Sequence, residues 1–367
     1  MNILNMLLRK PLTLAEGLAR KRQDNYLLLR HVAAVLLIYS HSYALAPGAN
    51  GAHDVVASVL PGFDGGRVAV LLFFAISGFL VTSSYLARPQ WWRFVWARVL
   101  RIYPAYVTCL ALTVLITGVG FTTWSWREYF QAPATWSYLL HNFGLTGLHY
   151  TLPGAYPASA YPGVVNGSLW SLALEVRLYL YLAVLAGAGL LRWHRIAALA
   201  IATFIIIELP LWSHWPVDGD GKHALILVFA ATAAAACIAN YFPVATRILL
   251  LLIGVTWLSR AQPFAYGLTI ACITYFSFWF AYRVPFVALR IPGDYSYGLF
   301  LYGFPVQQML IEGDPAITPW QLTLVALLLV LLFAMLSWHL IEARALSLLA
   351  SHWSGLQAAN ATGMAGD

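Results

Sequence analysis

Charged residues are scarce in this chain of 367 residues: only 10% are Asp, Glu, Lys or Arg, whereas 61% are hydrophobic. The mean hydropathy is +0.72. A water-soluble domain could not hide so much apolar surface from water. The composition therefore excludes an ordinary soluble protein and predicts a polytopic membrane protein.

Cysteine is also scarce, and all three cysteines (Cys109, Cys237 and Cys272) lie inside apolar runs. There they behave as small hydrophobic residues, so the sequence predicts no disulfide framework. The net charge of +7 does not indicate nucleic-acid binding, because the basic residues are scattered through short loops. No metal-binding cluster stands out. The apolar stretches before the first basic cluster are too short for a secretory signal, so we expect no cleaved leader.

Ten apolar segments have the length, or nearly the length, that crosses a bilayer. They lie near residues 27–46, 67–87, 100–118, 168–190, 196–212, 223–240, 245–258, 264–281, 295–311 and 319–341. Most Lys and Arg residues fall on alternate connections, which by the positive-inside rule places both ends of the chain in the cytoplasm. We predict an all-α transmembrane helical bundle of about ten spans with both termini cytoplasmic.

Three regions follow from this pattern: a basic amphipathic segment at 1–25, a transmembrane domain at 26–345, and a cytoplasmic tail at 346–367. In the first region, Thr13-Leu-Ala-Glu16 has the capping-box pattern that opens a short helix, which we expect to lie against the anionic inner leaflet. A long outer loop near 119–167 is rich in Trp and Tyr. These aromatic residues fit an interfacial belt, and one or two of them fit a platform for a sugar ring.

Arg30 and His41 lie eleven residues apart on the first predicted span. Eleven helical steps return to within about 20° of the same face and rise about 16 Å. A charge at membrane depth is costly unless it faces a polar interior, so a cation and a titratable base on one helix face predict a functional site.

The fourth predicted span carries Glu175 and Tyr179 one helical turn apart. Helix rise places Glu175 about 10 Å below the outer end of its span, at a depth similar to that of His41. A His–Glu pair would fix the imidazole tautomer and raise its basicity, as a general base requires. A structural ion pair between Glu175 and Arg177, or another arginine, is an equally good interpretation of the same spacing.

These motifs resemble acyltransferase family 3, whose members have ten membrane spans. The Arg30-to-His41 spacing is similar to the first-helix motif of that family. The similarity continues through Gly66 to Leu80, Arg98-Val-Leu-Arg101-Ile-Tyr103-Pro104, Asn166-Gly-Ser-Leu-Trp170-Ser-Leu-Ala-Leu-Glu175, Asp294 to Pro305, and Ile341-Glu342. It covers nearly the whole chain. The ordered set is specific, although each motif alone is weak.

The chain departs from the family pattern at two points. Many members have His before an aromatic residue and Pro in the ninth span, where this chain has Gly303, and Ala343-Arg344 replaces the usual basic residue and Pro after Glu342. We therefore assign no chemistry to the ninth span. No appended extracytoplasmic esterase-like domain is expected, so acyl transfer is completed within the membrane domain or with a partner protein.

The resemblance implies an O-acyltransferase of the bacterial inner membrane, with acetyl-CoA or another short acyl-CoA as donor and no tightly bound cofactor. The expected acceptor is a sugar hydroxyl of an exopolysaccharide, capsule or lipopolysaccharide, and polysaccharide-assembly proteins are expected partners. We expect His41, oriented by Glu175 or another carboxylate, to deprotonate the acceptor hydroxyl or to relay the acyl group. Arg30, Arg98 and Arg101 are expected to bind the coenzyme phosphates. The candidate oxyanion or substrate contacts are Ser77, Tyr179 and Trp170.

Two other classes of protein remain open. A transporter for a glycan or a lipid-linked sugar would also need buried charge near the midplane, although we see no inverted repeat in the sequence. A structural membrane subunit would keep Arg30 only as the partner of a carboxylate. Within the enzyme class, a lipid or a small-molecule hydroxyl is the alternative acceptor.

Overall fold

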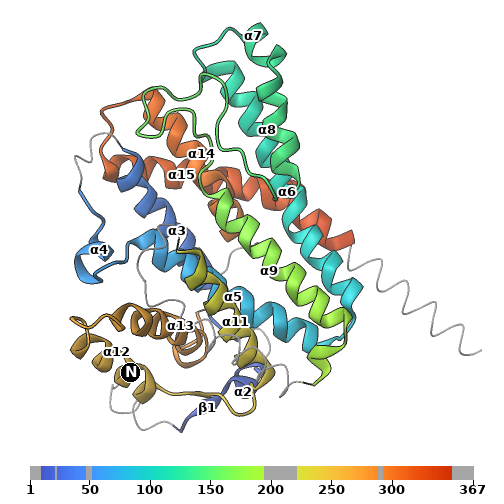
Figure 1. The fold of residues 1–367 in the computed structure, drawn as a ribbon, viewed down its shortest axis with the longest axis vertical. Coiled ribbons are helices and arrows are strands. Elements are labelled where there is room, and N and C mark those ends of the chain that lie inside the picture. The colour runs from blue at the N-terminus through green and yellow to red at the C-terminus, as the bar shows by residue number, and fades with distance from the viewer. Residues whose placement is uncertain (1–9, 21–22, 47–51, 194–220, 288–291, 349–367) are drawn as a thin grey trace, which may run out of the picture. The chain divides into compact units, whose positions relative to one another are not determined.

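The computed structural model describes residues 10–20, 23–46, 52–193, 221–287 and 292–348, and helices dominate these residues (Figure 1). The only regular strands in this part of the chain are two residues long, β1 (Leu12–Thr13) and β2 (Pro243–Val244), which pair antiparallel. The all-α prediction is therefore confirmed for the described residues.

The chain divides into two compact units. The first unit comprises residues 1–40, 53–90 and 177–290, and the second comprises residues 41–52, 91–176 and 291–367. Both units include residues of the transmembrane domain predicted over 26–345, and the boundaries of that domain stay predictions. Two helices contribute to both: α3 (Tyr26–Leu45) and α9 (Leu169–Gly187).

The first unit is built around α5 (Gly65–Ala87), which packs against α11 (Lys222–Cys237) and α13 (Ala265–Arg283). The α5–α11 contact requires glycine at position 78, because a Cβ there would overlap the Thr232 hydroxyl and the Phe229 carbonyl. Next to it, the buried Phe79 ring packs edge-on against Phe278. The remaining elements of the unit are α2 (Leu14–Ala19), α4 (Val55–Val59), η2 (Leu190–Arg192) and α12 (Thr246–Leu258).

The N-terminal helix α2 begins as its sequence predicts. The Thr13 hydroxyl accepts a hydrogen bond from the Glu16 amide, and the Glu16 carboxylate accepts one from the Thr13 amide, so the capping box is confirmed. Its Gly17 lies against the Tyr282 ring, where a Cβ would come within 2.8 Å of Cδ1. This helix therefore packs on α13, while its contact with the inner leaflet stays a prediction.

The second unit contains α6 (Trp91–Gly120), α7 (Trp126–Gln131), α8 (Pro133–Phe143), α14 (Ser296–Gly313), α15 (Pro319–Ser337) and the π-helical turn η3 (Trp338–Glu342). Figure 1 shows α7 and α8 beside α6, and α14 beside α15. Gly298 permits the second contact, because a Cβ there would come within 2.6 Å of the Ala334 Cα atom.

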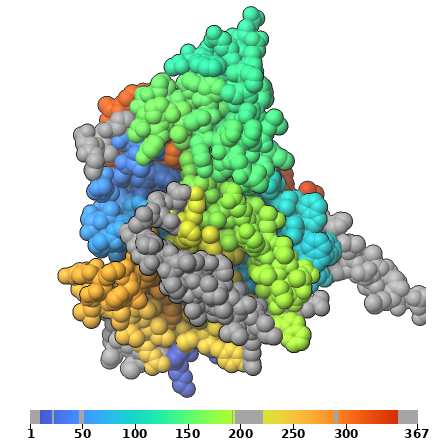
Figure 2. All heavy atoms as spheres, viewed as in Figure 1, coloured from blue at the N-terminus to red at the C-terminus, as the bar shows by residue number. Residues whose placement is uncertain are grey.

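The long connection predicted at 119–167 is folded. It contains α7 and α8, and two isolated β-bridges, Thr122–Ala155 and Thr151–Val164, close the rest of it. Figure 2 shows the atoms of this connection, teal to green on the colour bar, packed together at the top of the view. Three of its tyrosines, Tyr129, Tyr138 and Tyr156, are buried, so they cannot meet lipid or a sugar. The other aromatic residues are exposed (Trp124, Trp126, Trp136, Phe143 and Tyr161) or partly buried (Phe121, Phe130 and Tyr150).

Nine of the ten predicted spans coincide with helices α3, α5, α6, α9, α11, α12, α13, α14 and α15, and the tenth, 196–212, lies outside the described residues. Helix α6 begins at Trp91, nine residues before the prediction. Six described helices are long and apolar enough to cross a membrane: α3, α5, α6, α9, α13 and the run Pro319–Leu348. The chain is therefore a multi-pass membrane protein, while ten spans and the orientation of the ends stay predictions.

Candidate active site

Helix α3 carries both Arg30 and His41. The helix begins at Tyr26, whose amide donates to the Asp24 carboxylate. Arg30 is partly buried and belongs to the first unit, whereas His41 is partly buried and begins the segment that belongs to the second. The structure therefore confirms that one continuous helix joins the cation and the base.

The His41 ring packs edge-on against Phe304 of α14, with ring centroids 5.5 Å apart and an interplanar angle of 79°. Phe304 is buried, and its ring also lies against Gly167, where a Cβ would come within 2.7 Å of the Phe304 Cε2 atom. This edge-to-face geometry is favourable for aromatic pairs and restricts the orientation of the imidazole. The close approach of the Phe304 ring explains why the second residue of the Asn-Gly-Ser motif is glycine.

Polar side chains hold the backbone around this aromatic contact. Asn166 donates from Nδ2 to the Leu301 carbonyl at 3.1 Å and accepts at Oδ1 from the Ser168 amide at 3.1 Å. Asn166 thereby ties the start of α9 to α14, one helical turn before Phe304. The Asn-Gly-Ser motif thus positions the ring that contacts His41.

The residue after His41 is fixed by a side chain that the sequence analysis missed. Gln307 of α14 donates from Nε2 to the Ser42 hydroxyl at 2.8 Å, and both residues are fully buried. Its neighbour Gln308 accepts from Ser159 at 2.6 Å and donates to the Val164 carbonyl at 2.6 Å. Two adjacent glutamines in an apolar helix are the sequence signal that would have identified these contacts. We refer to Asn166, Gln307 and Gln308 as the polar clamp.

Glu175 and Trp170 are both partly buried on α9. Within the described residues, the contact established for His41 is with the Phe304 ring. The predicted His41–Glu175 pair therefore stays a prediction, as does a role for Trp170.

Ser77 and Tyr179 are brought together within the first unit. The Tyr179 hydroxyl donates to the Ser77 hydroxyl at 3.2 Å. The sequence placed these two residues on different spans as separate candidates, and the structure joins them. The adjacent Gly78 makes the close contact with α11, so this part of α5 serves packing as well.

Arg101 lies in an ion-pair network inside the second unit. Its guanidinium binds the Asp294 carboxylate at 2.8 Å and the Glu342 carboxylate at 3.0 Å. The rings of Tyr297 and Trp338 lie 5.5 and 5.6 Å from its Cζ atom. Glu342 is fully buried and also accepts from Ser337, so the network connects α6, the start of α14 and η3. Arg98 is partly buried one turn earlier on α6.

Asp54 forms a buried polar node in the first unit, next in space to the residue that precedes His41. Its Oδ2 atom accepts from the Ser40 hydroxyl and the Gly65 amide, both at 2.7 Å, and its Oδ1 atom accepts from the Ala57 amide at 2.9 Å. Burial raises the pKa of the Asp54 carboxyl, but these hydrogen bonds outweigh burial and hold the pKa below its ordinary value. The node fixes the end of α3 to the start of α5.

No group of three or more His, Cys, Asp or Glu side chains that could hold a metal ion occurs among the described residues. Of the three arginines predicted to bind the coenzyme phosphates, Arg101 is already held by two carboxylates, and Arg30 and Arg98 are partly buried on α3 and α6. Binding of the donor by any of them stays a prediction.

Apolar helices that carry an intramembrane histidine, a polar clamp and a buried ion-pair network define a multi-pass membrane protein with a candidate reaction site. A sequence profile described as "Acyltransferase domain" matches residues 26–221, more than half of the chain. The chain belongs to this family, acyltransferase family 3, as its motifs predict.

Two relatives extend the similarity over nearly the whole chain. An "O-acetyl transferase" of Shigella phage Sf6 is 28% identical over 339 residues, which cover 87% of this chain and 94% of the relative. "Nodulation protein 10" of Rhizobium leguminosarum bv. viciae is 28% identical over 359 residues, which cover 89% of this chain and 94% of the relative. No solved structure matches the chain.

Proposed function

We propose that this membrane acyltransferase transfers an acetyl group from acetyl-CoA to a sugar hydroxyl of an exopolysaccharide, capsule or lipopolysaccharide at the bacterial inner membrane. The observation that carries the proposal is the placement of His41: a titratable base inside an apolar helix, set against Phe304 beside the Asn-Gly-Ser motif. The similarity to a protein named O-acetyl transferase supports acetyl as the acyl group.

His41 acts as the general base in this proposal. It takes the proton of the acceptor hydroxyl while the oxygen attacks the thioester carbonyl carbon. The carbon–sulfur bond then breaks, and the coenzyme leaves as the thiol after it receives the proton from the imidazolium. General-base catalysis of this kind contributes about 10²–10⁴-fold. Phe304 restricts the ring, and Glu175 is the proposed partner for the second imidazole nitrogen.

The other predicted residues take separate roles. Arg30 and Arg98 bind the coenzyme phosphates, because a guanidinium offers paired N–H donors that match phosphate oxygens. Arg101, held by Asp294 and Glu342, supports the inner part of the second unit. Tyr179 and Ser77 are candidate donors to the developing oxyanion, and Trp170 is a candidate contact for the sugar ring.

The test compares surface glycans from cells with and without the gene, using mass spectrometry and proton NMR. We expect deletion to remove O-linked acetyl groups and leave the glycan backbone in place. Loss of the whole polymer, or intact precursor trapped inside the cell, would favour a transporter. If neither acetylation nor export changes, the acceptor is a lipid or a small-molecule hydroxyl, and the glycan proposal fails.

A further inference from the structure

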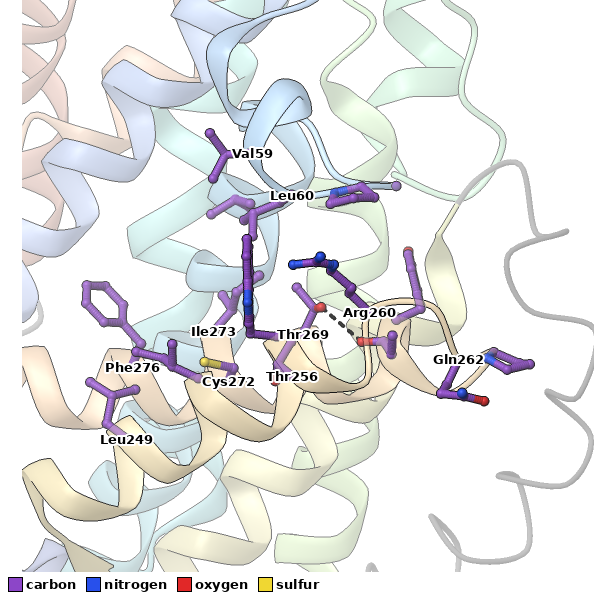
Figure 3. A pocket seen from close by; sticks show the side chains of 18 of the residues that line it. Val59, Leu60, Leu249, Thr256, Arg260, Gln262, Thr269, Cys272, Ile273 and Phe276 are labelled. Carbon is purple, nitrogen blue, oxygen red and sulfur yellow. Dashed lines mark hydrogen bonds between the residues drawn. The ribbon is translucent and has the colours of Figure 1, made fainter.

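The first unit contains a large cavity that includes none of the predicted site residues. It has a volume of about 950 Å³ and lies between α12, α13, the start of α5 and the loop after α4 (Figure 3). This volume is at the upper end of the range for sites that bind small ligands. We call it the α12–α13 groove.

The α12–α13 groove has an apolar end and a polar end. Figure 3 shows Leu249, Phe276 and Ile273 gathered at one end, and Arg260 and Gln262 towards the other. Arg260 is the only Lys or Arg among the described residues that line the groove. A ligand that matches both ends has a hydrocarbon chain joined to an anionic group.

The polar end presents donors and no carboxylate. The Arg260 guanidinium lies over the Trp257 ring at 4.2 Å and is exposed, so its N–H groups can reach a ligand. The Thr256 hydroxyl, which also lines the groove, is buried without a hydrogen-bond partner in the described part of the chain. A buried donor of this kind needs an acceptor, and a guanidinium pairs most strongly with phosphate oxygens.

We propose that the α12–α13 groove binds an anionic phospholipid, with one acyl chain along Leu249, Ile273 and Phe276 and the phosphate at Arg260. The membrane supplies this ligand directly, and its two chemical parts match the two ends of the groove. None of the residues that line the groove is among those assigned to acyl transfer. Lipid binding is therefore measurable without turnover, and its failure would leave the acyltransferase proposal intact.

The test is native mass spectrometry of the full-length protein in detergent. The probes are dioleoyl phosphatidylglycerol and dioleoylglycerol, which share acyl chains and differ by the phosphate-bearing headgroup. We expect tighter binding of the phosphatidylglycerol. Arg260→Gln should weaken that binding about tenfold, because it removes a charge-assisted hydrogen bond, and should leave dioleoylglycerol binding unchanged.

Two further variants separate the groove from general effects. Ile253→Trp adds bulk at a residue that lines the groove. Because Ile253 is 47% exposed, the variant should still fold, and it should weaken binding of both probes. Arg127→Gln removes an exposed arginine from α7, outside the groove, and should change neither. Equal effects of Arg260→Gln and Arg127→Gln would overturn the proposal. So would a native dimer that Ile253→Trp dissociates while phospholipid binding persists.

Discussion

The imidazole of His41 lies against an aromatic ring. Its plane is nearly perpendicular to that of the Phe304 ring, and the next residue, Ser42, is anchored by Gln307. A ring contact of this kind does not depend on which imidazole nitrogen carries a proton. The ring therefore keeps its orientation when one of the two nitrogens is unprotonated. Substitutions on α3 can therefore change activity or donor binding without an equal change in stability.

Arg30→Lys should weaken acetyl-CoA binding more than it lowers the melting temperature. Lysine keeps the positive charge but loses the planar pair of N–H donors that matches a phosphate. Equilibrium binding of acetyl-CoA to the purified protein measures the first quantity, and thermal unfolding in detergent measures the second. Arg127→Lys, at an exposed position on α7, is the matched control. Unchanged donor affinity in Arg30→Lys would show that Arg30 is structural.

Asp54→Asn should destabilise the first unit by about 1–3 kcal/mol, because an amide nitrogen replaces one acceptor oxygen among buried donors. The folded pKa of Asp54 is below its unfolded value of about 3.9, so the charged carboxylate stabilises the fold above that pH. This contribution is lost as pH falls through the folded pKa. The melting-temperature difference from wild type should therefore stay constant from about pH 8 to pH 5 and shrink below about pH 4.

Asp64→Asn is the control for this measurement. Asp64 caps α5 by accepting from the Arg67 amide, and asparagine is an equally good cap residue. Its melting temperature should stay close to that of wild type. A difference for Asp54→Asn that is already lost between pH 8 and pH 6 would contradict the assignment.

Secondary-structure elements that are distant in the sequence meet at Arg101. The guanidinium on α6 binds Asp294, 193 residues later, and Glu342, 241 residues later. Removing one partner of a buried ion pair leaves an uncompensated charge. The network therefore predicts a stability defect at a residue that the sequence alone assigned to donor binding.

Arg101→Gln should destabilise the protein by about 3–5 kcal/mol, with loss of folded protein in the membrane fraction. The double variant Arg101→Gln with Glu342→Gln should recover part of that loss, because the buried Glu342 carboxylate is then neutral. Thermal unfolding of both single variants and the double variant gives the coupling free energy between Arg101 and Glu342. Full stability of Arg101→Gln together with a loss of acetyl-CoA affinity would contradict the structural role and support donor binding by Arg101.

Sequence patterns predicted the elements better than the contacts between them. Thr13 and Glu16 identified a helix start because capping is local, and apolar segments of about spanning length located nine described helices. The pairing of Arg101 with Asp294 and Glu342 depends on tertiary packing, which spacing does not encode. The ninth span was assigned no chemistry because Gly303 departs from the family pattern, yet its next residue, Phe304, contacts His41.

At the scale of the whole molecule, helices long and apolar enough to cross a bilayer establish a multi-pass protein. The direction of insertion rests on the distribution of Lys and Arg residues along the sequence. From that distribution we predict that the connection between α5 and α6 lies in the cytoplasm and that the segment that contains α7 lies outside it. Each connection offers an exposed residue, Gln90 and Arg127 respectively, for labelling.

Cysteine labelling tests the orientation. In a variant with Cys109, Cys237 and Cys272 replaced, Arg127→Cys should react with a membrane-impermeant maleimide in cells whose inner membrane is intact. Gln90→Cys should react only after that membrane is permeabilised. The reverse pattern would invert the predicted topology and place the acceptor and donor on the wrong sides.

The most direct measurement is the O-acetyl content of surface glycan in cells whose only copy of the gene carries His41→Ala. We predict a loss of about 10²–10⁴-fold at wild-type protein level, because the substitution removes the general base. His31→Ala is the matched control: it lies on the same helix, where its Nδ1 atom contacts the Leu27 carbonyl oxygen at 2.7 Å, and it should keep normal acetylation. Wild-type acetylation in His41→Ala cells, at equal protein level, would contradict the account.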